Sequence, residues 1–298
     1  MDVCISVIGL ESWFGGDFAG VTELVQVADR MGIDQVSAVD HVVLGEDHSA
    51  YPYGKFPGTV EAPWIEPMVQ LATFAAVTKR IKLSSGIVIA PLRPAPVLAK
   101  QIATLETLSY GRVEIGLGVG WHREEYDACG VPWESRFELL EEQVAACKAL
   151  WSSAPASFSG KHINFEGLHA IPLPPRRGET PIWFGIAPLA RNIERIAKLG
   201  VGWLPMERDP EKLVQPIDKL RKAFTAAGRD PAELKVRASY QMVRGENGRP
   251  DVEATLAATS TYAAAGVTVM RAEPAVFCRK REDFEPFLER LLKAKDAA

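Results

Sequence analysis

Residues 80–121 read RIKLSSGIVIAPLRPAPVLAKQIATLETLSYGRVEIGLGVGW, and this stretch decides the fold. An apolar run rich in β-branched residues, Lys82 to Ile89, passes through the proline-rich residues 90–96 into a helical pattern over 97–108. A second apolar run, Val113 to Leu117, ends among glycines. Strands that are apolar throughout are buried on both faces, and parallel strands need a long connection of this kind. The stretch therefore predicts two parallel strands whose ends open on the same face of a sheet.

The same alternation continues along the rest of the chain. Strand-like runs are predicted at 3–10, 35–39, 82–89, 113–117, 181–185, 202–204, 235–241 and 267–271. Helices are predicted at 22–31, 67–78, 97–108, 136–150, 189–199, 210–227, 252–265 and 284–294. Right-handed βαβ units build either an open doubly wound sheet or a closed barrel, and the pattern alone does not choose between these two folds.

The chain length fits one domain with insertions. A (β/α)8 barrel needs about 250 residues, and this chain has 298, so we expect one domain over 1–298 with insertions at about 42–66 and 152–180. Residues 42–66 are rich in Tyr, Pro and Gly, and a long loop of this kind is usually functional. We expect it to be a lid over a pocket; the alternative is a plain surface loop.

Composition excludes several classes of protein. The net charge of −4 gives no electrostatic basis for binding nucleic acid or an anionic membrane. No run of 18 apolar residues and no basic leader is present, and the four cysteines are scattered, so we expect a cytoplasmic protein with reduced thiols. The five histidines lack metal-ligand spacing, so we predict no metal site. No serine lies in a G-x-S-x-G motif, which leaves hydrolysis without support.

The run from Leu98 to Arg112, together with the Gly116-Leu117-Gly118-Val119-Gly120-Trp121 motif, resembles the luciferase-like monooxygenase superfamily. It is most similar to the branch of that superfamily that uses the deazaflavin coenzyme F420. The resemblance covers nearly the whole chain. It implies an α/β fold of the (β/α)8 TIM-barrel type with insertion loops at the C-terminal face, coenzyme F420 as cofactor, a small-molecule substrate, and a homodimer.

Asp40 and His41 follow the second predicted strand, at the face that carries the chemistry of barrel enzymes. The resemblance implies that His41 faces the hydride-transfer position of the cofactor as the catalytic residue and that Asp40 lies beside the ring. Imidazole titrates near neutral pH, which suits the proton loss that must accompany hydride loss from an alcohol carbon. The alternative is a turn-capping aspartate beside a packed histidine. Asp47-His48 repeats the dipeptide inside the 42–66 segment, where we expect it to be solvated; the alternative is that it lines the pocket.

Gly86-Ile87 interrupts the third strand with a glycine, which marks a bulge or a close approach of backbone to ligand. The resemblance implies a non-prolyl cis peptide here, whose bulge backs the deazaflavin ring. The alternative is an ordinary strand glycine.

The glycines of 116–120 lack the spacing of a Rossmann fingerprint, so NAD binding by this route is weakly supported. We expect the backbone at Val119 and Gly120 to approach the cofactor. Related sugar-phosphate and alcohol dehydrogenases have a glutamate where this chain has Trp121, which argues against their substrates and against a two-residue acid-base mechanism.

Gly185-Ile186-Ala187 follows the fifth strand and opens a helix, whose free N–H groups could hold a cofactor phosphate. Ile186 stands where most similar proteins have a second glycine. Arg191, one turn into the helix, either pairs with the phosphate or lies on a solvated face.

Two rival functions remain. The first is an FMN-dependent monooxygenase fed by a separate flavin reductase, and the second is a non-catalytic flavin or deazaflavin binder. F420 continues beyond its phosphate into an anionic tail, so a basic groove would favour it over FMN. Residues that could form such a groove are Lys161, Arg176, Arg177 and Arg195. Arg93, in the third loop, either borders the pocket or holds loops together.

Overall fold

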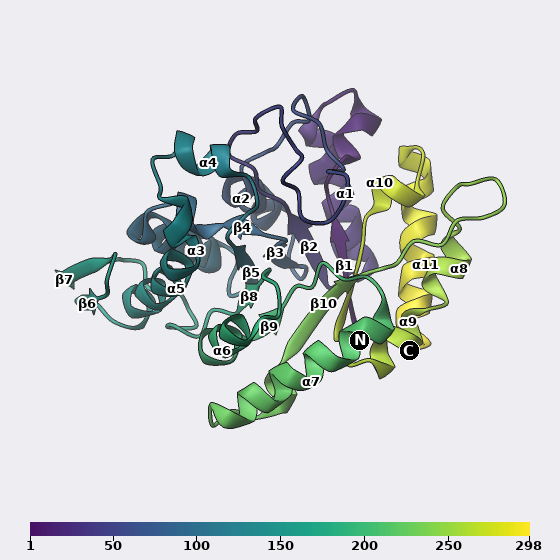
Figure 1. Cartoon of the computed structure of the whole chain (residues 1–298). Helices are drawn as coiled ribbons and strands as arrows, with labels where there is room; N and C mark the ends of the chain where they lie inside the picture. Colours follow the sequence, from purple (N-terminus) through teal and green to yellow (C-terminus); the bar gives the residue numbers. More distant parts are fainter.

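The predicted parallel strands close into a barrel (Figure 1). The computed structural model describes all residues, 1–298. Strand β1 pairs with β2 on one side and with β11 on the other, and β3 pairs with β5, so the ring has no free edge. The strands of the ring are β1 (Asp2–Ser6), β2 (Gln35–Ala38), β3 (Lys82–Ser85), β4 (Val88–Ile89), β5 (Val113–Gly118), β8 (Ile182–Phe184), β9 (Gly202–Trp203), β10 (Lys235–Ser239) and β11 (Val269–Ala272).

Helices surround the ring and bury its outward face in a main apolar cluster of 60 residues. The strand side chains alternate between this outer layer and the barrel interior. The helices are α1 (Phe18–Met31), α2 (Pro67–Val77), α3 (Ala95–Leu108), α4 (Arg123–Ala128), α5 (Arg136–Ser152), α6 (Ala190–Leu199), α7 (Pro210–Ala226), α8 (Val252–Leu256), α9 (Thr259–Ala264), α10 (Pro274–Phe277) and α11 (Phe284–Asp296). No helix is both long enough and apolar enough to cross a bilayer.

Several element boundaries differ from the sequence prediction. The first strand ends at Ser6 instead of residue 10, and residues 10–14 form a 3₁₀ helix. The first helix begins at Phe18 because the Asp17 carboxylate accepts a hydrogen bond from the Ala19 N–H at 2.8 Å. The helix predicted over 252–265 is two short helices, α8 and α9. These differences do not change the order of the barrel.

The third barrel strand is broken in two, as the glycine at position 86 indicated. Strands β3 and β4 flank Gly86 and Ile87, whose connecting peptide is cis. Both halves pair with β5: Leu83 is opposite Val113, and Val88 is opposite Leu117. The interruption therefore brings Ile87 to the C-terminal end of the barrel without opening the ring.

The two predicted insertions lie in different places. Residues 42–66 connect β2 to α2 and cross one end of the barrel, whereas both chain termini lie toward the other end (Figure 1). Residues 152–180 contain the antiparallel hairpin of β6 (Ala156–Ser159) and β7 (Asn164–Leu168). This segment joins the end of α5 to the start of β8, and its hairpin projects from the side of the molecule (Figure 1).

A buried carboxylate joins α1 to the start of β3. Asp29 accepts hydrogen bonds from the N–H groups of Lys79, Arg80 and Ile81 at 2.6–3.0 Å. Burial opposes the charged carboxylate, but the three donors outweigh it and hold the pKa of Asp29 below its ordinary value. The ionised side chain therefore holds the connection between α2 and β3 against α1.

We expect Asp29→Asn to lower the free energy of unfolding by about 2 kcal/mol at pH 7, because the amide accepts fewer of these bonds and carries no charge. The folded pKa is below the unfolded value of about 4, so the contribution is complete above pH 4 and is lost as pH falls through the folded pKa. Urea unfolding of both proteins between pH 7 and pH 3 measures this. A stability difference that stays constant over this range would contradict the role.

Candidate active site

The glycine-rich strand ends meet at the C-terminal end of the barrel. The Gly185 N–H donates to the Leu117 carbonyl at 2.9 Å, which places the end of β8 beside β5. A Cβ atom on Gly118 would lie 2.8 Å from Ile87 Cδ1, and one on Gly185 would collide with the same side chain. Because Gly118 and Gly185 have no side chains, the ends of β5 and β8 leave room for Ile87, which forms an apolar floor between them.

Val119 and Gly120 continue from β5 beside this floor. Val119 is buried, and its carbonyl accepts a hydrogen bond from the Tyr126 hydroxyl. Gly120 has a φ of +66°, and a Cβ there would lie 3.1 Å from Ile89. The motif therefore turns tightly over the end of β4 and leads into α4.

His41 is held by a glutamate that the sequence did not single out. The Glu125 carboxylate, fully buried on α4, lies 3.1 Å from His41 Nδ1 and accepts a second hydrogen bond from the Val42 N–H at 2.8 Å. With Nδ1 directed at the carboxylate, Nε2 is the nitrogen that remains for another partner. The His41 side chain is 9% exposed. His41 and Glu125 therefore form a fixed dyad at the mouth of the barrel.

An aromatic lid covers this dyad; we define it as Tyr51, Phe56, Trp64 and Trp121. Ring centroids lie 4.6 Å apart for His41 and Trp64 and 5.1 Å apart for both the Phe56–Trp121 and Tyr51–Trp121 pairs. The expectation that residues 42–66 form a lid fits this packing. A cavity of about 250 Å³ lies beside Trp64, between the lid and the ends of β1 and β2.

The second Asp-His dipeptide is not simply solvated. Asp47 is exposed, but the His48 ring packs 4.6 Å from Phe56, and its buried Nε2 atom has no hydrogen-bond partner. The expectation that His48 is solvated was therefore wrong, because the rings of Phe56, Trp121 and His122 pack against it.

The Asp40 carboxylate lies in a salt-bridge network. Its carboxylate accepts hydrogen bonds from both terminal nitrogens of Arg93, at 2.7 and 3.0 Å, and from the Ile89 N–H at 2.8 Å. Arg93 also reaches Glu66, the residue that caps α2, at 2.8 Å. Burial tends to lower the pKa of Arg93, but the two carboxylates outweigh it and raise that pKa. Of the two alternatives for Arg93, the structure supports the one in which it holds loops together.

The N-terminus of α6 presents backbone and one cation to solvent. Ala187 and Arg191 are exposed, whereas Ile186 is buried and its carbonyl accepts a hydrogen bond from Trp203 Nε1 at 3.0 Å. The Ala187 carbonyl is bound by the Asn192 amide at 2.9 Å. The loop before α6 is thus fixed from behind, with its outer side open.

Three of the four cations considered for a basic groove are engaged elsewhere. Lys161 pairs with Glu138 and Arg195 with Glu141, each at 2.8 Å, and Arg176 pairs with the buried Glu106. Arg177 is exposed. Most of these cations are therefore paired with carboxylates of the protein itself.

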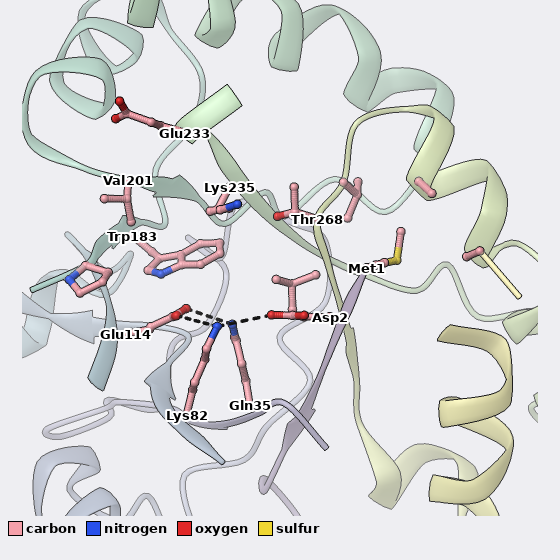
Figure 2. Close-up of a pocket in the computed structure, with 15 residues that line it drawn as sticks. Met1, Asp2, Gln35, Lys82, Glu114, Trp183, Val201, Glu233, Lys235 and Thr268 are labelled. Carbon is pink, nitrogen blue, oxygen red and sulfur yellow. Dashed lines mark hydrogen bonds and ion pairs between the residues drawn. The ribbon is translucent and has the colours of Figure 1, made fainter. Parts of the chain in front are cut away.

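A cavity of about 790 Å³ occupies the opposite, N-terminal end of the barrel (Figure 2). None of the predicted site residues lines it. Lys82 lies 3.0 Å from Glu114 and 3.4 Å from Asp2, and the Gln35 amide donates to Glu114 at 3.0 Å, so these groups point toward one another in Figure 2. Barrel enzymes carry their chemistry at the C-terminal face. We therefore place the active site at the His41 end despite the larger cavity here.

A family model described as luciferase-like monooxygenase matches residues 7–292. The chain belongs to this family. The members of this family are oxidoreductases, monooxygenases among them.

This luciferase-like chain is similar to a protein known by sequence and to solved structures whose named activities differ. An uncharacterised protein of Mycobacterium tuberculosis (strain H37Rv) is 36% identical over 167 residues, which are 56% of this chain and only 58% of that relative. The monooxygenase RslO1 of Streptomyces bottropensis matches with a TM-score of 0.70 and 24% identity over 89% of this chain and 78% of its own. An F420-dependent secondary alcohol dehydrogenase, solved with an F420-acetone adduct, matches with a TM-score of 0.65 and 18% identity over 99% and 91%. At these identities the two structures show the fold alone.

Some polar atoms near the mouth of the barrel suit a flat tricyclic ring with polar edges, such as the ring of F420 or that of FMN. Buried polar groups are nearly always paired, yet four of the eight unpaired buried side-chain atoms of this luciferase-like protein belong to residues 42–66 or to the barrel strands β2 and β11. These four atoms are Ser37 Oγ, His48 Nε2, Trp64 Nε1 and Arg271 Nε. The apolar side chain of Ile87, with the unpaired Ser37 Oγ beside Gly86, suits a ring that is apolar on its faces and hydrogen-bonding at its edges.

Sequence reasoning missed Glu125 and Arg271. Glu125 is one of two adjacent glutamates, and only the fold shows which of them faces His41. Arg271 left a usable signal, because a charged residue inside a strand that is otherwise apolar must point into the barrel interior.

Proposed function

We propose that this luciferase-like protein is an F420-dependent oxidoreductase that moves hydride between the deazaflavin and an alcohol or carbonyl carbon of a small organic substrate. The observation that carries the proposal is the His41–Glu125 dyad, buried under aromatic rings at the C-terminal end of the barrel, the end to which the Gly86–Ile87 break also belongs. Bound F420 would supply the hydride acceptor or donor, which no side chain can replace.

His41 has the proton-transfer role in this proposal. Glu125 holds Nδ1, so Nε2 can take the hydroxyl proton as hydride leaves the alcohol carbon, and it returns that proton in the reverse direction. The aromatic lid excludes water from the reacting atoms. Trp121 contributes a lid ring where similar dehydrogenases have a carboxylate, so Glu125 serves as the orienting acid instead.

The cofactor would lie against three backbone segments. Gly86 and Ile87 would back the ring, and Val119 with Gly120 would border it. The open loop of Gly185, Ile186 and Ala187 would present N–H groups to the phosphate, with Arg191 as its cation. Asp40 would act indirectly, because Arg93 holds both of its carboxylate oxygens. We expect the protein to be a cytoplasmic homodimer. Light scattering on the purified protein tests the oligomeric state.

A second candidate is an FMN-dependent monooxygenase supplied by a flavin reductase. The pairing of Lys161, Arg176 and Arg195 with carboxylates favours it, because FMN ends at one phosphate and needs no basic groove for a tail. The third candidate is a non-catalytic binder. The packing of the lid rings on His41 favours it, because the lid must move before a tricyclic ring can enter.

A cofactor titration separates these candidates. Purified protein is titrated separately with F420 and FMN while the fluorescence of its tryptophans is followed, since Trp64 and Trp121 lie in the lid. We expect F420 to bind in the micromolar range and FMN at least about tenfold more weakly. The reverse order would support the monooxygenase, and binding of neither cofactor would contradict both enzymatic proposals.

A further inference from the structure

One side of the barrel wall near its C-terminal end is polar, in contrast to the glycines that surround Ile87. We call this side the polar floor and define it as Ser6, Ser37, Ser239 and Arg271. The Arg271 guanidinium reaches across the strands to Ser6 Oγ at 2.9 Å and to Ser239 Oγ at 3.4 Å. Ser37 lies opposite Ser6 in the β1–β2 register, and its Oγ lies 3.1 Å from where a Cβ of Gly86 would be. The polar floor therefore adjoins the proposed ring site.

Two polar atoms of this floor lack partners. Nε of Arg271 and Oγ of Ser37 are both buried and form no hydrogen bond. The Arg271 side chain is 17% exposed, so part of its guanidinium reaches the space above the floor. Because unpaired buried donors are rare in folded proteins, these two atoms indicate a partner that the chain itself does not supply.

The charge around Arg271 is positive. Glu273 is its carboxylate neighbour, at 3.3 Å, but the same carboxylate oxygen also lies 3.7 Å from Arg208. Two guanidinium groups thus share one carboxylate. Tyr51 of the lid lies within range of these charges: burial, Tyr53 and Glu273 raise the pKa of Tyr51, while the charges of Arg208 and Arg271 lower it. An anion at this position would be attracted and also shielded from water.

We propose that the polar floor binds an oxyanion of the substrate, a carboxylate or a phosphate, and that Arg271 is the residue that recognises it. The inference rests on the proposed function, because it places the ring over Ile87 and leaves the polar floor for the substrate. Guanidinium groups bind such oxyanions through charge-assisted hydrogen bonds with fixed geometry. The enzyme would thereby select hydroxy or keto compounds that carry an acidic group, and would orient their reacting carbon relative to His41.

Matched small probes test this directly. Benzoate, phenyl phosphate and the neutral benzyl alcohol are titrated into the full-length protein while the ¹⁵N NMR signals of the arginine Nε–H groups are followed. We expect at least one anion to bind about tenfold or more tightly than benzyl alcohol and to shift the Arg271 signal. The benzoate and phenyl phosphate arms show which oxyanion is preferred.

Three variants isolate Arg271 in this experiment. Arg271→Gln should remove the preference for the anion and leave the affinity for benzyl alcohol unchanged. Arg244→Gln is the matched control, because Arg244 is an exposed arginine bound to the Gly248 carbonyl in a distant loop. Glu273→Gln should tighten anion binding by roughly threefold, because it removes the competing carboxylate, and this result does not require Arg271→Gln to fold.

The inference is overturned if all three probes bind equally, if Arg271→Gln or Glu273→Gln leaves anion affinity unchanged, or if Arg271→Gln weakens F420 binding tenfold. The last result would assign the polar floor to the cofactor. Failure of the proposed function has a different signature: neither F420 nor FMN binds wild-type protein, while the anion preference still depends on Arg271.

Discussion

Turnover should fall by about 10²–10⁴-fold when His41 is replaced by alanine, the range by which a positioned general acid-base group accelerates proton transfer. The affinity for F420 should remain within roughly twofold of wild type, since the lost group acts in the transition state and not in cofactor binding. The loss of absorbance of oxidised F420 measures turnover, with the best substrate from a panel of secondary alcohols and hydroxy acids. Tryptophan fluorescence measures the affinity.

Glu125→Gln measures the contribution of Glu125 separately from that of His41. The amide can still hydrogen-bond the ring but cannot stabilise its protonated form, so we expect a smaller loss of turnover, about tenfold or more, and a changed dependence of kcat on pH. His162→Ala is the matched control, because His162 lies on the hairpin segment and contacts Glu138, so its turnover should match wild type. Unchanged turnover in His41→Ala would remove the residue from the mechanism and favour the non-catalytic binder.

Much of the fold could be predicted because it depends on local pattern. Buried parallel strands are apolar throughout, so Lys82–Ile89 and Val113–Leu117 were recognisable, and Gly86 marked the break between β3 and β4. Closure of the ring was not visible in the pattern, because an open sheet has the same alternation, and it came from the family resemblance. Strand ends were less certain: Leu10 is apolar in either a strand or a 3₁₀ helix, and only the turn at Gly9, with a φ of +80°, separates the two.

The candidate site was predictable to the extent that strand ends determine it. Parallel strands end at one face, so His41, Ile87 and Gly185 could be expected together without knowledge of any side-chain contact. The partners of these residues depend on loops whose paths are not periodic. Glu125 reaches His41 across 84 positions of the chain, and nothing local marks that contact.

Asp40→Ala should lower the free energy of unfolding by about 3–5 kcal/mol, because it leaves the Arg93 guanidinium buried without its main counter-charge. The Asp40 side chain is 1% exposed and that of Arg93 is 11% exposed, so water cannot replace the lost carboxylate easily. The Ile89 N–H loses its acceptor in the same variant. Urea unfolding of the cofactor-free protein measures the effect, with the midpoint and slope both fitted.

The matched control for Asp40→Ala is Asp127→Ala, which removes the exposed partner of Arg123 at 3.8 Å. Such surface pairs contribute about 0–1 kcal/mol, so the control should unfold nearly as wild type does. Asp40→Ala combined with Arg93→Met should be more stable than Asp40→Ala alone, because the second change removes the uncompensated charge. If Asp40→Ala kept wild-type stability but lost F420 affinity, Asp40 would be a direct cofactor ligand, as the family resemblance first implied, and its pairing with Arg93 would be secondary.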